Sequence, residues 1–547
     1  MILYLYMNRK RKIEFIFLFV VIVLAIALRF YKLGLVPVGV THDELGYIYN
    51  SYSIALTGKN VFSEPFPFLT WMVQGGFPFL PVAVYFTVPI YWFFEISLTI
   101  ARTPYALLGV LDVILVYLLV KKLFSDGKLA ILSAFFVAIS PWHLHFSRSA
   151  YDPNVSLFFY LLAIVLFFVE VQRKKIPFFS VLSFLLAIFS YRGMTVLFLP
   201  LVFFLGWYGK QFLKVSKKQS LGFAGGILIV IFLFFTVIHF FGESYTKEAL
   251  FFQDPKVQET IDGSIRESQG PLLLRRLFIN KPTFYLRTLS ENYLKSYSPE
   301  FLFLYTEPNQ IYSIWTRGRV YLLDLPFLIL GVFYFFTKRK KTALFMLGLF
   351  LISGLPGMIG GAPYSARNLF MAVVIPVFVA GGVLFLISCV RLRWVRVLTI
   401  GLLAVLYAYS LGGYLFDYYY RYAYQSAEAW AKSLQDVSVI AHNEILKQRQ
   451  VIITNTSFGD VVQFAFYEKY HPASIQNTWK NKKQSEDGYE YTSGLVTFQR
   501  ECIQLENIPE LKKKNITLIT AHDCNKEATP SAFIRDYFGN PIWKIYN

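Results

Sequence analysis

Long runs of apolar residues, separated by short polar stretches, dominate the first 415 positions of this 547-residue chain. A membrane helix needs about 20 mostly apolar residues, and eleven runs in this part of the chain approach or reach that length. We expect each of them to cross a membrane as a helix. The runs cover residues 13–31, 103–120, 129–145, 154–172, 176–191, 193–209, 220–241, 320–337, 342–360, 368–390 and 396–414.

A twelfth apolar segment, Phe79 to Ile96, contains Pro81 and Pro89. Proline lacks a backbone donor and disfavours a regular crossing. We therefore expect an interfacial or half-inserted helix here. The alternative is a true span combined with a second error in the count.

The composition and the charge pattern indicate a polytopic membrane protein. Hydrophobic residues make up 55% of the chain and charged residues only 16%, which argues against a soluble enzyme. The net charge of +19 lies wholly before residue 416, because residues 416–547 hold 15 acidic and 15 basic side chains. Six short basic clusters between the apolar runs are typical of cytoplasmic loops and argue against nucleic-acid binding. The clusters are Arg9 to Lys12, Lys121/Lys122/Lys128, Arg173 to Lys175, Lys210/Lys214/Lys217/Lys218, Lys338 to Lys341 and Arg391/Arg393/Arg396.

These clusters also predict the orientation of the chain. If the first cluster is cytoplasmic, eleven crossings place the other five clusters in the cytoplasm as well. Three large segments, 32–102, 242–319 and 416–547, then lie on the outer face. We expect a membrane domain over 1–415 in the plasma membrane, with a cytoplasmic N-terminus, and an extracytoplasmic domain over 416–547.

The long apolar runs stop after residue 415, and the pattern changes to that of a small α/β domain. Val451 to Tyr470 predicts a β-branched strand, a polar turn and a helix, and Ile516 to Thr520 predicts another strand. Cys502 and Cys524 either form a disulfide or remain two unpaired small hydrophobes. None of the three cysteines forms a CxxC pair, so we expect no structural zinc site.

Two adjacent acids, Asp43 and Glu44, follow the first apolar run. Carboxylates at a membrane boundary cost solvation energy, so they usually have a partner or a catalytic task. The alternative is structural, because Thr41 or Asp43 suits the N-cap of a helix that continues through Tyr47.

The outer loop from Ser140 to Asn154 collects polar and aromatic side chains beside lipid. Two histidines at a spacing of two are a weak metal signal without a third ligand, so we expect no metal. An interfacial belt of aromatic and histidine side chains is the alternative interpretation of His143. The candidates for contact with a substrate in this loop are His143, Arg148, Tyr151 and Asp152.

Several motifs occur in a fixed order from the end of the first span to this loop. They are Arg29-Phe30-Tyr31, Pro37, Asp43-Glu44, Gly46-Tyr47, Tyr52, Thr57-Gly58, Ser140-Pro141-Trp142-His143 and Phe146-Ser147-Arg148. This order resembles the GT-C membrane glycosyltransferases, in particular the family 39 type related to protein O-mannosyltransferases and to the aminoarabinose transferase of lipid A. The resemblance implies a GT-C fold with about eleven membrane helices.

The resemblance also implies a reaction. A sugar on a polyprenyl phosphate would be transferred, with inversion, to an acceptor on the outer face. The first acid of the pair acts as general base in such enzymes, so that role falls on Asp43, with Glu44 as an orienting partner. The partners implied are the lipid-linked donor, membrane lipids and an acceptor that is a protein, a lipid or a glycan, and no cofactor is implied.

The departing lipid phosphate requires fixed cations. Arg148 and Arg367 are the first candidates, with Tyr364 beside the second of them. Asp152, His143 and Tyr151 are candidates for substrate binding. The interpretation of each arginine as an interfacial anchor remains open.

Two other classes of function fit an apolar chain of this length. A transporter or lipid flippase is expected to show internal repeats and charged or broken helices near the bilayer midplane. A non-catalytic protein of envelope-polysaccharide assembly is the third class. The candidate residues gather at one face, which favours the enzyme, and Asp112 in the second span has no assigned role.

Overall fold

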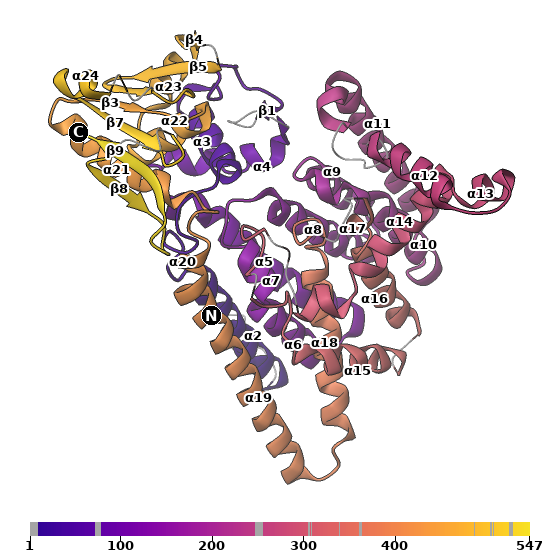
Figure 1. The fold of residues 1–547 in the computed structure, drawn as a ribbon. Coiled ribbons are helices and arrows are strands. Elements are labelled where there is room, and N and C mark those ends of the chain that lie inside the picture. The colour runs from indigo at the N-terminus through magenta and orange to yellow at the C-terminus, as the bar shows by residue number, and fades with distance from the viewer. Residues whose placement is uncertain are drawn as a thin grey trace. The chain divides into compact units, whose positions relative to one another are not determined.

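The computed structural model describes residues 9–71, 78–246, 255–304, 307, 309–314, 316–337, 340–359, 364–485, 487–503, 506, 508–524 and 529–547. They form two compact units, shown as a ribbon in Figure 1. The helical unit takes its residues from 1–31, 105–147 and 152–414. The sheet unit takes its residues from 32–104, 148–151 and 415–547, so it joins the predicted C-terminal domain with the outer segment that follows the first span.

The helical unit consists of helices, most of them apolar. They are α2 (Arg9–Phe30), α5 (Leu98–Phe124, which begins in the sheet unit), α6 (Gly127–Ile139), α7 (Pro141–Phe146), α8 (Asp152–Gln172), α9 (Phe178–Ile188), η2 (Arg192–Leu197), α10 (Phe198–Phe212), α11 (Lys217–Thr246), α12 (Pro255–Glu267), α13 (Leu272–Phe278), α14 (Lys281–Lys295), η4 (Glu300–Leu304), α15 (Asp324–Phe336), α16 (Lys340–Ser353), α17 (Pro356–Ile359), α18 (Met371–Cys389) and α19 (Arg393–Phe416).

Each of the eleven predicted spans contains a helix, but the span 129–145 is divided at Ser140 between α6 and α7, and the span 320–337 becomes helical only at Asp324. Within the described residues, seven helical segments are long and apolar enough to cross a membrane, and three further apolar helices, α6, α9 and α15, are shorter. The remaining predicted span, 103–120, lies within α5. The prediction of a polytopic helical protein is confirmed, and the number and direction of the crossings remain predictions. Two residues of the predicted cytoplasmic clusters, Lys338 and Arg339, lie outside the described residues.

Helix α18 is the buried centre of the helical unit. Every residue from Met371 to Val383 is buried, as expected for a helix that is apolar on all sides. Two glycines let its backbone approach that of α15: a Cβ atom on Gly331 would meet the Phe378 carbonyl oxygen at 2.0 Å, and one on Gly382 would meet the Phe327 carbonyl oxygen at 2.0 Å. Small residues at such crossings are typical of helix packing in membranes.

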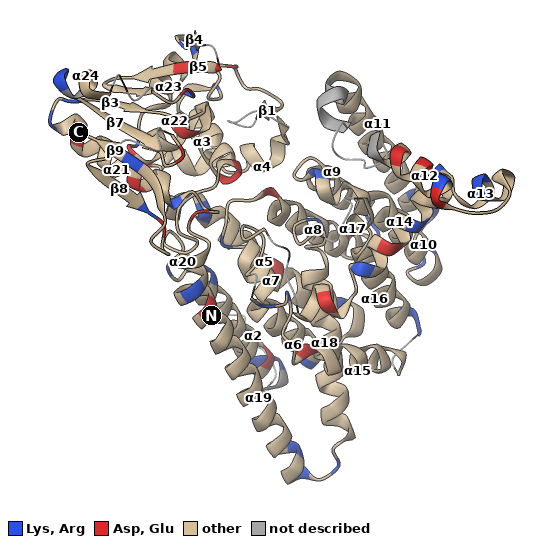
Figure 2. Ribbon diagram, viewed as in Figure 1, with Lys and Arg blue, Asp and Glu red and all other residues tan. Residues whose placement is uncertain are grey.

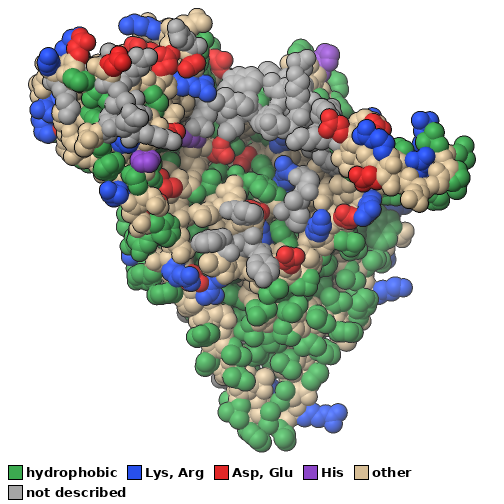
Figure 3. All heavy atoms as spheres, in the orientation of Figure 1, with side chains coloured by type: hydrophobic (Ala, Val, Ile, Leu, Met, Phe, Trp, Pro, Cys, Tyr) green, Lys and Arg blue, Asp and Glu red, His purple; other side chains and the backbone are tan. Residues whose placement is uncertain are grey.

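Helices α11 and α19 carry apolar side chains that no other part of the chain covers. Phe232 on α11 is 69% exposed and Val405 on α19 is 65% exposed. Figure 3 shows that the surface over α15, α18 and α19 consists mostly of hydrophobic side chains. The charges of α19 lie only in its first turn, whereas α12 carries charges of both signs (Figure 2). Exposed apolar bands of this kind face lipid.

The sheet unit combines a seven-stranded mixed sheet with short helices. The strand order is β4-β5-β6-β3-β7-β9-β8, with β3 parallel to both β6 and β7. Its elements are α3 (His42–Thr57), β1 (Thr70–Trp71), β2 (Pro78–Phe79), α4 (Pro81–Tyr85), η1 (Val88–Trp92), η5 (Asp417–Tyr422), α20 (Ala423–Gln425), α21 (Lys432–Leu446), β3 (Gln450–Ile453), α22 (Phe458–Tyr467), α23 (Pro472–Lys480), β4 (Lys483–Ser485), β5 (Gly488–Ser493), β6 (Val496–Phe498), α24 (Ile508–Lys513), β7 (Ile516–Ala521), β8 (Ala532–Arg535) and β9 (Pro541–Tyr546).

Helices cover both faces of this sheet. Ile508 of α24 packs with Leu518 of β7 on one face. On the other face Thr517, the neighbour of Leu518, donates a hydrogen bond to Glu444 of α21, because successive strand residues point to opposite sides. The predicted order of strand, turn and helix over Val451 to Tyr470 is confirmed, and a capping box between Ser457 and Asp460 starts the helix.

The segment Phe79 to Ile96 forms no spanning helix. It contains two five-residue helices, α4 and η1, each with a proline near its start. The fixed φ of proline suits a first turn, and its missing donor limits extension of the helix backwards. The prediction that this segment does not cross as a regular helix is confirmed, and its position at a membrane interface remains a prediction.

Cys502 and Cys524 form a disulfide, with their Cα atoms 5.7 Å apart, and Cys389 is free. We expect a thiol-reactive maleimide to label one cysteine per denatured chain without reductant and three after reduction.

Replacing both paired cysteines with serine should lower the stability of the sheet unit by about 3 kcal/mol, the chain-entropy value for a loop of this length. Intact-mass spectrometry and thermal unfolding measure the two effects, and the Cys389→Ser variant is the control. Labelling of three cysteines without reductant contradicts the disulfide.

Candidate active site

The two adjacent acids lie in the first turn of α3. Thr41 is the N-cap residue, and its hydroxyl accepts a hydrogen bond of 3.1 Å from the Glu44 amide. The capping interpretation is therefore correct for Thr41. Since the cap is supplied by Thr41, neither carboxylate is needed to start the helix.

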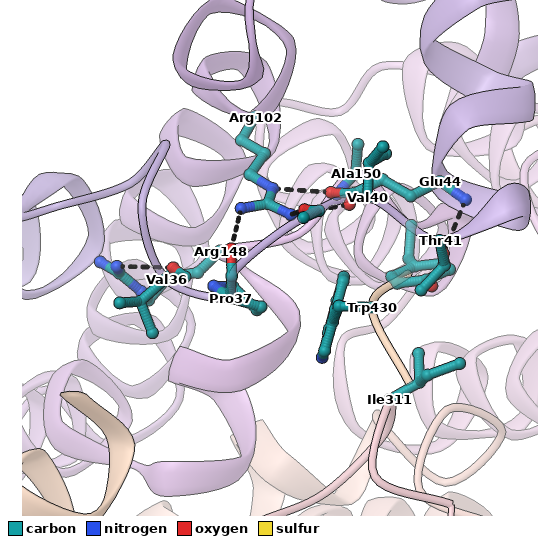
Figure 4. A network of polar contacts seen from close by, with 12 residues as sticks. Val36, Pro37, Val40, Thr41, Glu44, Arg102, Arg148, Ala150, Ile311 and Trp430 are labelled. Atoms are coloured by element: carbon teal, nitrogen blue, oxygen red, sulfur yellow. Dashed lines mark hydrogen bonds and ion pairs between the residues drawn. The ribbon is translucent and has the colours of Figure 1, made fainter. Parts of the chain in front are cut away.

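Glu44 is bound to a single arginine. Its carboxylate is fully buried and accepts two hydrogen bonds of 2.8 Å from Arg102 Nε and Nη2, as Figure 4 shows. The Ala150 amide donates a third, also at 2.8 Å. Two parallel N–H···O bonds fix both the position and the orientation of a carboxylate. The prediction that Glu44 has an orienting role agrees with this geometry.

The remaining N–H groups of Arg102 donate to backbone carbonyls of the loop before α3. Its guanidinium donates to the carbonyls of Leu33 at 3.3 Å, Pro37 at 2.8 Å and Gly39 at 2.9 Å. All five N–H groups of Arg102 thus have acceptors, which a fully buried guanidinium requires. Gly39 has a φ of 79°, and a Cβ there would meet the Trp430 carbonyl oxygen at 2.3 Å, so only glycine fits this turn.

Asp43 differs from its neighbour. It is only partly buried, and among the described residues its carboxylate makes no hydrogen bond or ion pair of normal geometry. Burial raises the pKa of Asp43, and the nearby His42 offsets part of that rise. A partly open carboxylate with a raised pKa is better suited to accept a proton than one held by a guanidinium.

Tyr151 and Arg148 lie in the same unit. The Tyr151 hydroxyl shares a hydrogen bond with the Thr41 hydroxyl, next to the two acids. Arg148 is 1% exposed, donates to the carbonyls of Lys32 at 3.3 Å and Val36 at 3.1 Å, and lies over the ring of Tyr418. Both of these backbone bonds come from Nη2, Nε donates to the Tyr418 hydroxyl at 3.4 Å, and the role of Arg148 at a phosphate remains a prediction.

A second group of candidates lies in the helical unit. Tyr191, at the start of η2, has Arg367 within hydrogen-bonding reach and Asp152 and Tyr364 close by. The Arg367 guanidinium lies 5.5 Å from the centre of the Tyr364 ring. Asp152 at the start of α8 and the loop that carries Tyr364 and Arg367 are far apart in the chain, and the helical unit brings them together around the Tyr191 phenol. Gly360 to Pro363, which precede Tyr364, lie outside the described residues.

A buried hydrogen-bond network holds the loop that carries Tyr364 and Arg367. Arg319 donates to the Ser365 hydroxyl at 2.7 Å and to Glu307 at 3.0 Å, and Glu307 also accepts a 2.9 Å bond from the Ser365 amide. The Trp142 indole donates to the Ser365 carbonyl at 3.2 Å. The Ser365 backbone is therefore fixed on both sides, and Arg367 starts from a rigid position.

His143 belongs to a different network. It is fully buried, with Nε2 3.2 Å from Asp112 and Nδ1 2.8 Å from Arg29. This arrangement gives Asp112, which had no assigned role, a partner inside the bundle. The contact of His143 with a substrate remains a prediction, and in this structure both of its ring nitrogens face protein groups. Among the described residues, no group of three His, Cys, Asp or Glu side chains has the arrangement of a metal site.

Arg102 and Tyr191 were not predicted from the sequence. Arg102 directly precedes the apolar run 103–120, and a lone arginine at the end of a span is often no more than an interfacial anchor. An arginine at such a boundary, in a chain with an unexplained acid at Glu44, is the signal from which the pair is predictable in principle. No local pattern marks Tyr191, because aromatic residues are frequent at the ends of spans.

Residues 76–240 match the family model of dolichyl-phosphate-mannose-protein mannosyltransferases. The match includes the loop from Ser140 to Asn154 and does not reach Asp43. None of the curated protein sequences matches the chain significantly.

Three solved structures are similar to this chain. ArnT from Cupriavidus metallidurans, solved with undecaprenyl phosphate, is 13% identical with a TM-score of 0.50, and the match covers 96% of this chain and 97% of that one. The apo oligosaccharyltransferase from Archaeoglobus fulgidus is 15% identical with a TM-score of 0.46, over 83% of this chain and 64% of that one. The S. cerevisiae protein O-mannosyltransferase complex is 18% identical with a TM-score of 0.31, over 43% of this chain and 34% of that one.

At those scores the archaeal and yeast proteins are too distant to support an argument, and this chain spans 64% of the length of the archaeal enzyme. The likeness to ArnT extends over nearly all of both chains and shows the fold. The protein is thus a membrane protein with the GT-C fold and a small C-terminal sheet domain. The family match over residues 76–240 and the likeness of fold to ArnT agree with the predicted resemblance to GT-C glycosyltransferases.

The Arg102–Glu44 pair generates a test of stability. Glu44→Gln leaves a buried guanidinium without its counter-charge, which costs about 3–5 kcal/mol, so the melting temperature of the purified protein should fall by about 10 °C. Glu490→Gln is the control, because it breaks an exposed pair with Lys483 at 3.8 Å, and such pairs contribute little. In a double-mutant cycle, adding Arg102→Met to Glu44→Leu should cost less than the sum of the single changes. An equal loss in Glu44→Gln and Glu490→Gln contradicts the structural role of the pair.

Proposed function

We propose that this protein transfers a sugar from a polyprenyl-phosphate carrier to an acceptor hydroxyl on the outer face of the plasma membrane, with inversion at the anomeric carbon. The observation that carries the proposal is the difference in environment between two adjacent acids. Glu44 is held by Arg102 and the Ala150 amide. Asp43 is partly exposed, and no described group neutralises its carboxylate by a hydrogen bond or ion pair of normal geometry.

Asp43 is the general base. It accepts the proton of the acceptor hydroxyl as that oxygen attacks the anomeric carbon, and the bond from that carbon to the phosphate oxygen breaks with its electron pair leaving on the phosphate. A single displacement of this kind inverts the configuration. The short first turn of α3, fixed by the Thr41 cap and the Glu44–Arg102 pair, positions the Asp43 carboxylate.

Arg367 is the main cation for the departing phosphate. Its side chain is partly exposed and stands beside Tyr191 and Tyr364, whereas Arg148 is buried and donates to the Tyr418 hydroxyl and two backbone carbonyls. A planar guanidinium on a rigid loop suits a phosphate that gains charge during the reaction. Asp152, Tyr151 and His143 remain candidates for substrate binding, and Asp152 lies close to Tyr191, as Arg367 does.

A lipid-linked donor agrees with what the similar proteins bind. The matching family is described by its dolichyl-phosphate-mannose donor, and ArnT was solved with undecaprenyl phosphate. The Cys502–Cys524 disulfide supports an outer location of the sheet unit, since such bonds persist in oxidising compartments. The acceptor is a protein, a lipid or a glycan.

Purified protein supplied with radiolabelled polyprenyl-phosphate sugars should consume the donor, and Asp43→Asn should lower kcat by about 10²–10⁴-fold. Because the pKa of Asp43 is raised on folding, its favourable contribution to stability is present below the unfolded pKa and lost as the pH rises through the folded pKa. At neutral pH the ionised acid costs stability, so Asp43→Asn should hold or raise the melting temperature. The exposed Asp523 supplies the control variant, Asp523→Asn. Normal turnover by Asp43→Asn excludes the base role.

The same base predicts a pH dependence. Only ionised Asp43 accepts a proton, so kcat/KM should fall on the acid side with a midpoint above about 3.9, the ordinary aspartate pKa. His42 lowers the pKa of Asp43, so His42→Gln should move the midpoint to higher pH. Rate profiles of the two proteins measure this shift, with Asp523→Asn again as the control. A midpoint that stays in place or moves to lower pH would argue against Asp43 as the titrating base.

A further inference from the structure

The sheet unit contains a cavity of about 430 Å³ that the proposed reaction does not use. The loop around Leu35 and Val38, the start of α5, and helices α21 and α22 supply its walls. The lining is mainly apolar, with contributions from Leu35, Val38, Ile96, Leu98 and Phe466. A cavity of this size and character falls in the usual range of small-ligand sites.

The only charged residues in the lining of this cavity are two lysines, Lys432 and Lys469, and no acid contributes to it. Lys432 pairs with Asp436 at 2.5 Å, and Lys469 pairs with Glu95 at 3.2 Å. Both pairs are partly or largely exposed, and pairs of this kind contribute little. Each ammonium can therefore take a stronger anion in place of its present partner.

Exposed aromatic side chains lie next to this cavity in the chain. Trp92, Phe93 and Phe94 are 62%, 77% and 54% exposed, and they directly precede Glu95 and Ile96. Leu35, in the cavity wall, is 64% exposed. Aromatic side chains of this kind gather at the headgroup level of a membrane, and in the chain they lead into the apolar helix α5.

Tyr467, which stands between Phe466 and Lys469 in the chain, also contributes to the lining.

We propose that this cavity binds one anionic phospholipid of the surrounding membrane. The phosphate lies between Lys432 and Lys469, and an acyl chain lies along the apolar wall formed by Leu35, Val38 and Ile96. Phospholipid fits better than a soluble anion, because most of the lining is apolar and the adjoining surface carries exposed aromatic residues. This site is independent of the glycosyl-transfer reaction and does not require it.

Native mass spectrometry of the full-length protein in detergent tests the proposal, with phosphatidylglycerol and phosphatidylcholine of equal chain length as probes. Wild-type protein should bind phosphatidylglycerol more tightly, and the double variant Lys432→Glu/Lys469→Glu should lose about tenfold in that affinity. The matched control is Lys483→Glu/Lys514→Glu, which breaks two exposed lysine–acid pairs elsewhere in the sheet unit. The control should bind both lipids as wild type does.

A second variant tests the apolar part. Gln435→Trp places a large ring in the cavity and should weaken both phospholipids about tenfold, with an unchanged melting temperature as the check on folding. Wild-type lipid binding by both cavity variants overturns the proposal. So does loss of polyprenyl-phosphate binding with phosphatidylglycerol binding intact, because the occupant would then be the carrier lipid.

Discussion

The arrangement of the candidate site depends on one buried interaction, the two-pronged pair between Arg102 and Glu44. A guanidinium and a carboxylate without solvent cost several kcal/mol each unless every donor and acceptor is used. Here each N–H of Arg102 has an acceptor, and three of those acceptors are carbonyls of the loop before α3. The pair therefore does more than neutralise charge. It ties the start of α5, the loop and the first turn of α3 into one rigid corner.

That corner separates two residues that are neighbours in the chain. Adjacent positions on a helix point about 100° apart, so Glu44 faces inward to Arg102 while Asp43 is left partly open. The other cations follow the same division. Arg148 donates to two backbone carbonyls and the Tyr418 hydroxyl, and Arg319 donates to the Ser365 hydroxyl. Arg367 is partly exposed beside two phenols.

The helical unit follows a second constraint, that of a bilayer. Its outward helices keep apolar side chains exposed, whereas the buried charged residues Arg29 and Asp112 both contact His143. Its helices pack closely where small residues let their backbones approach, as at Gly331 and Gly382. A deep acid in this chain is therefore part of the packing rather than a sign of transport.

The sequence alone determined the helical class, the positions of the apolar runs, the broken segment after Phe79 and the strand–turn–helix order after Val451, because these follow from local periodicity and turn chemistry. It also singled out the two acids of α3. Only the tertiary structure decided which acid is paired, that Cys502 meets Cys524, and that Asp152, Tyr364 and Arg367 surround Tyr191. Those facts depend on contacts between residues far apart in the chain, and side-chain patterns read along a single sequence carry no information about such distances.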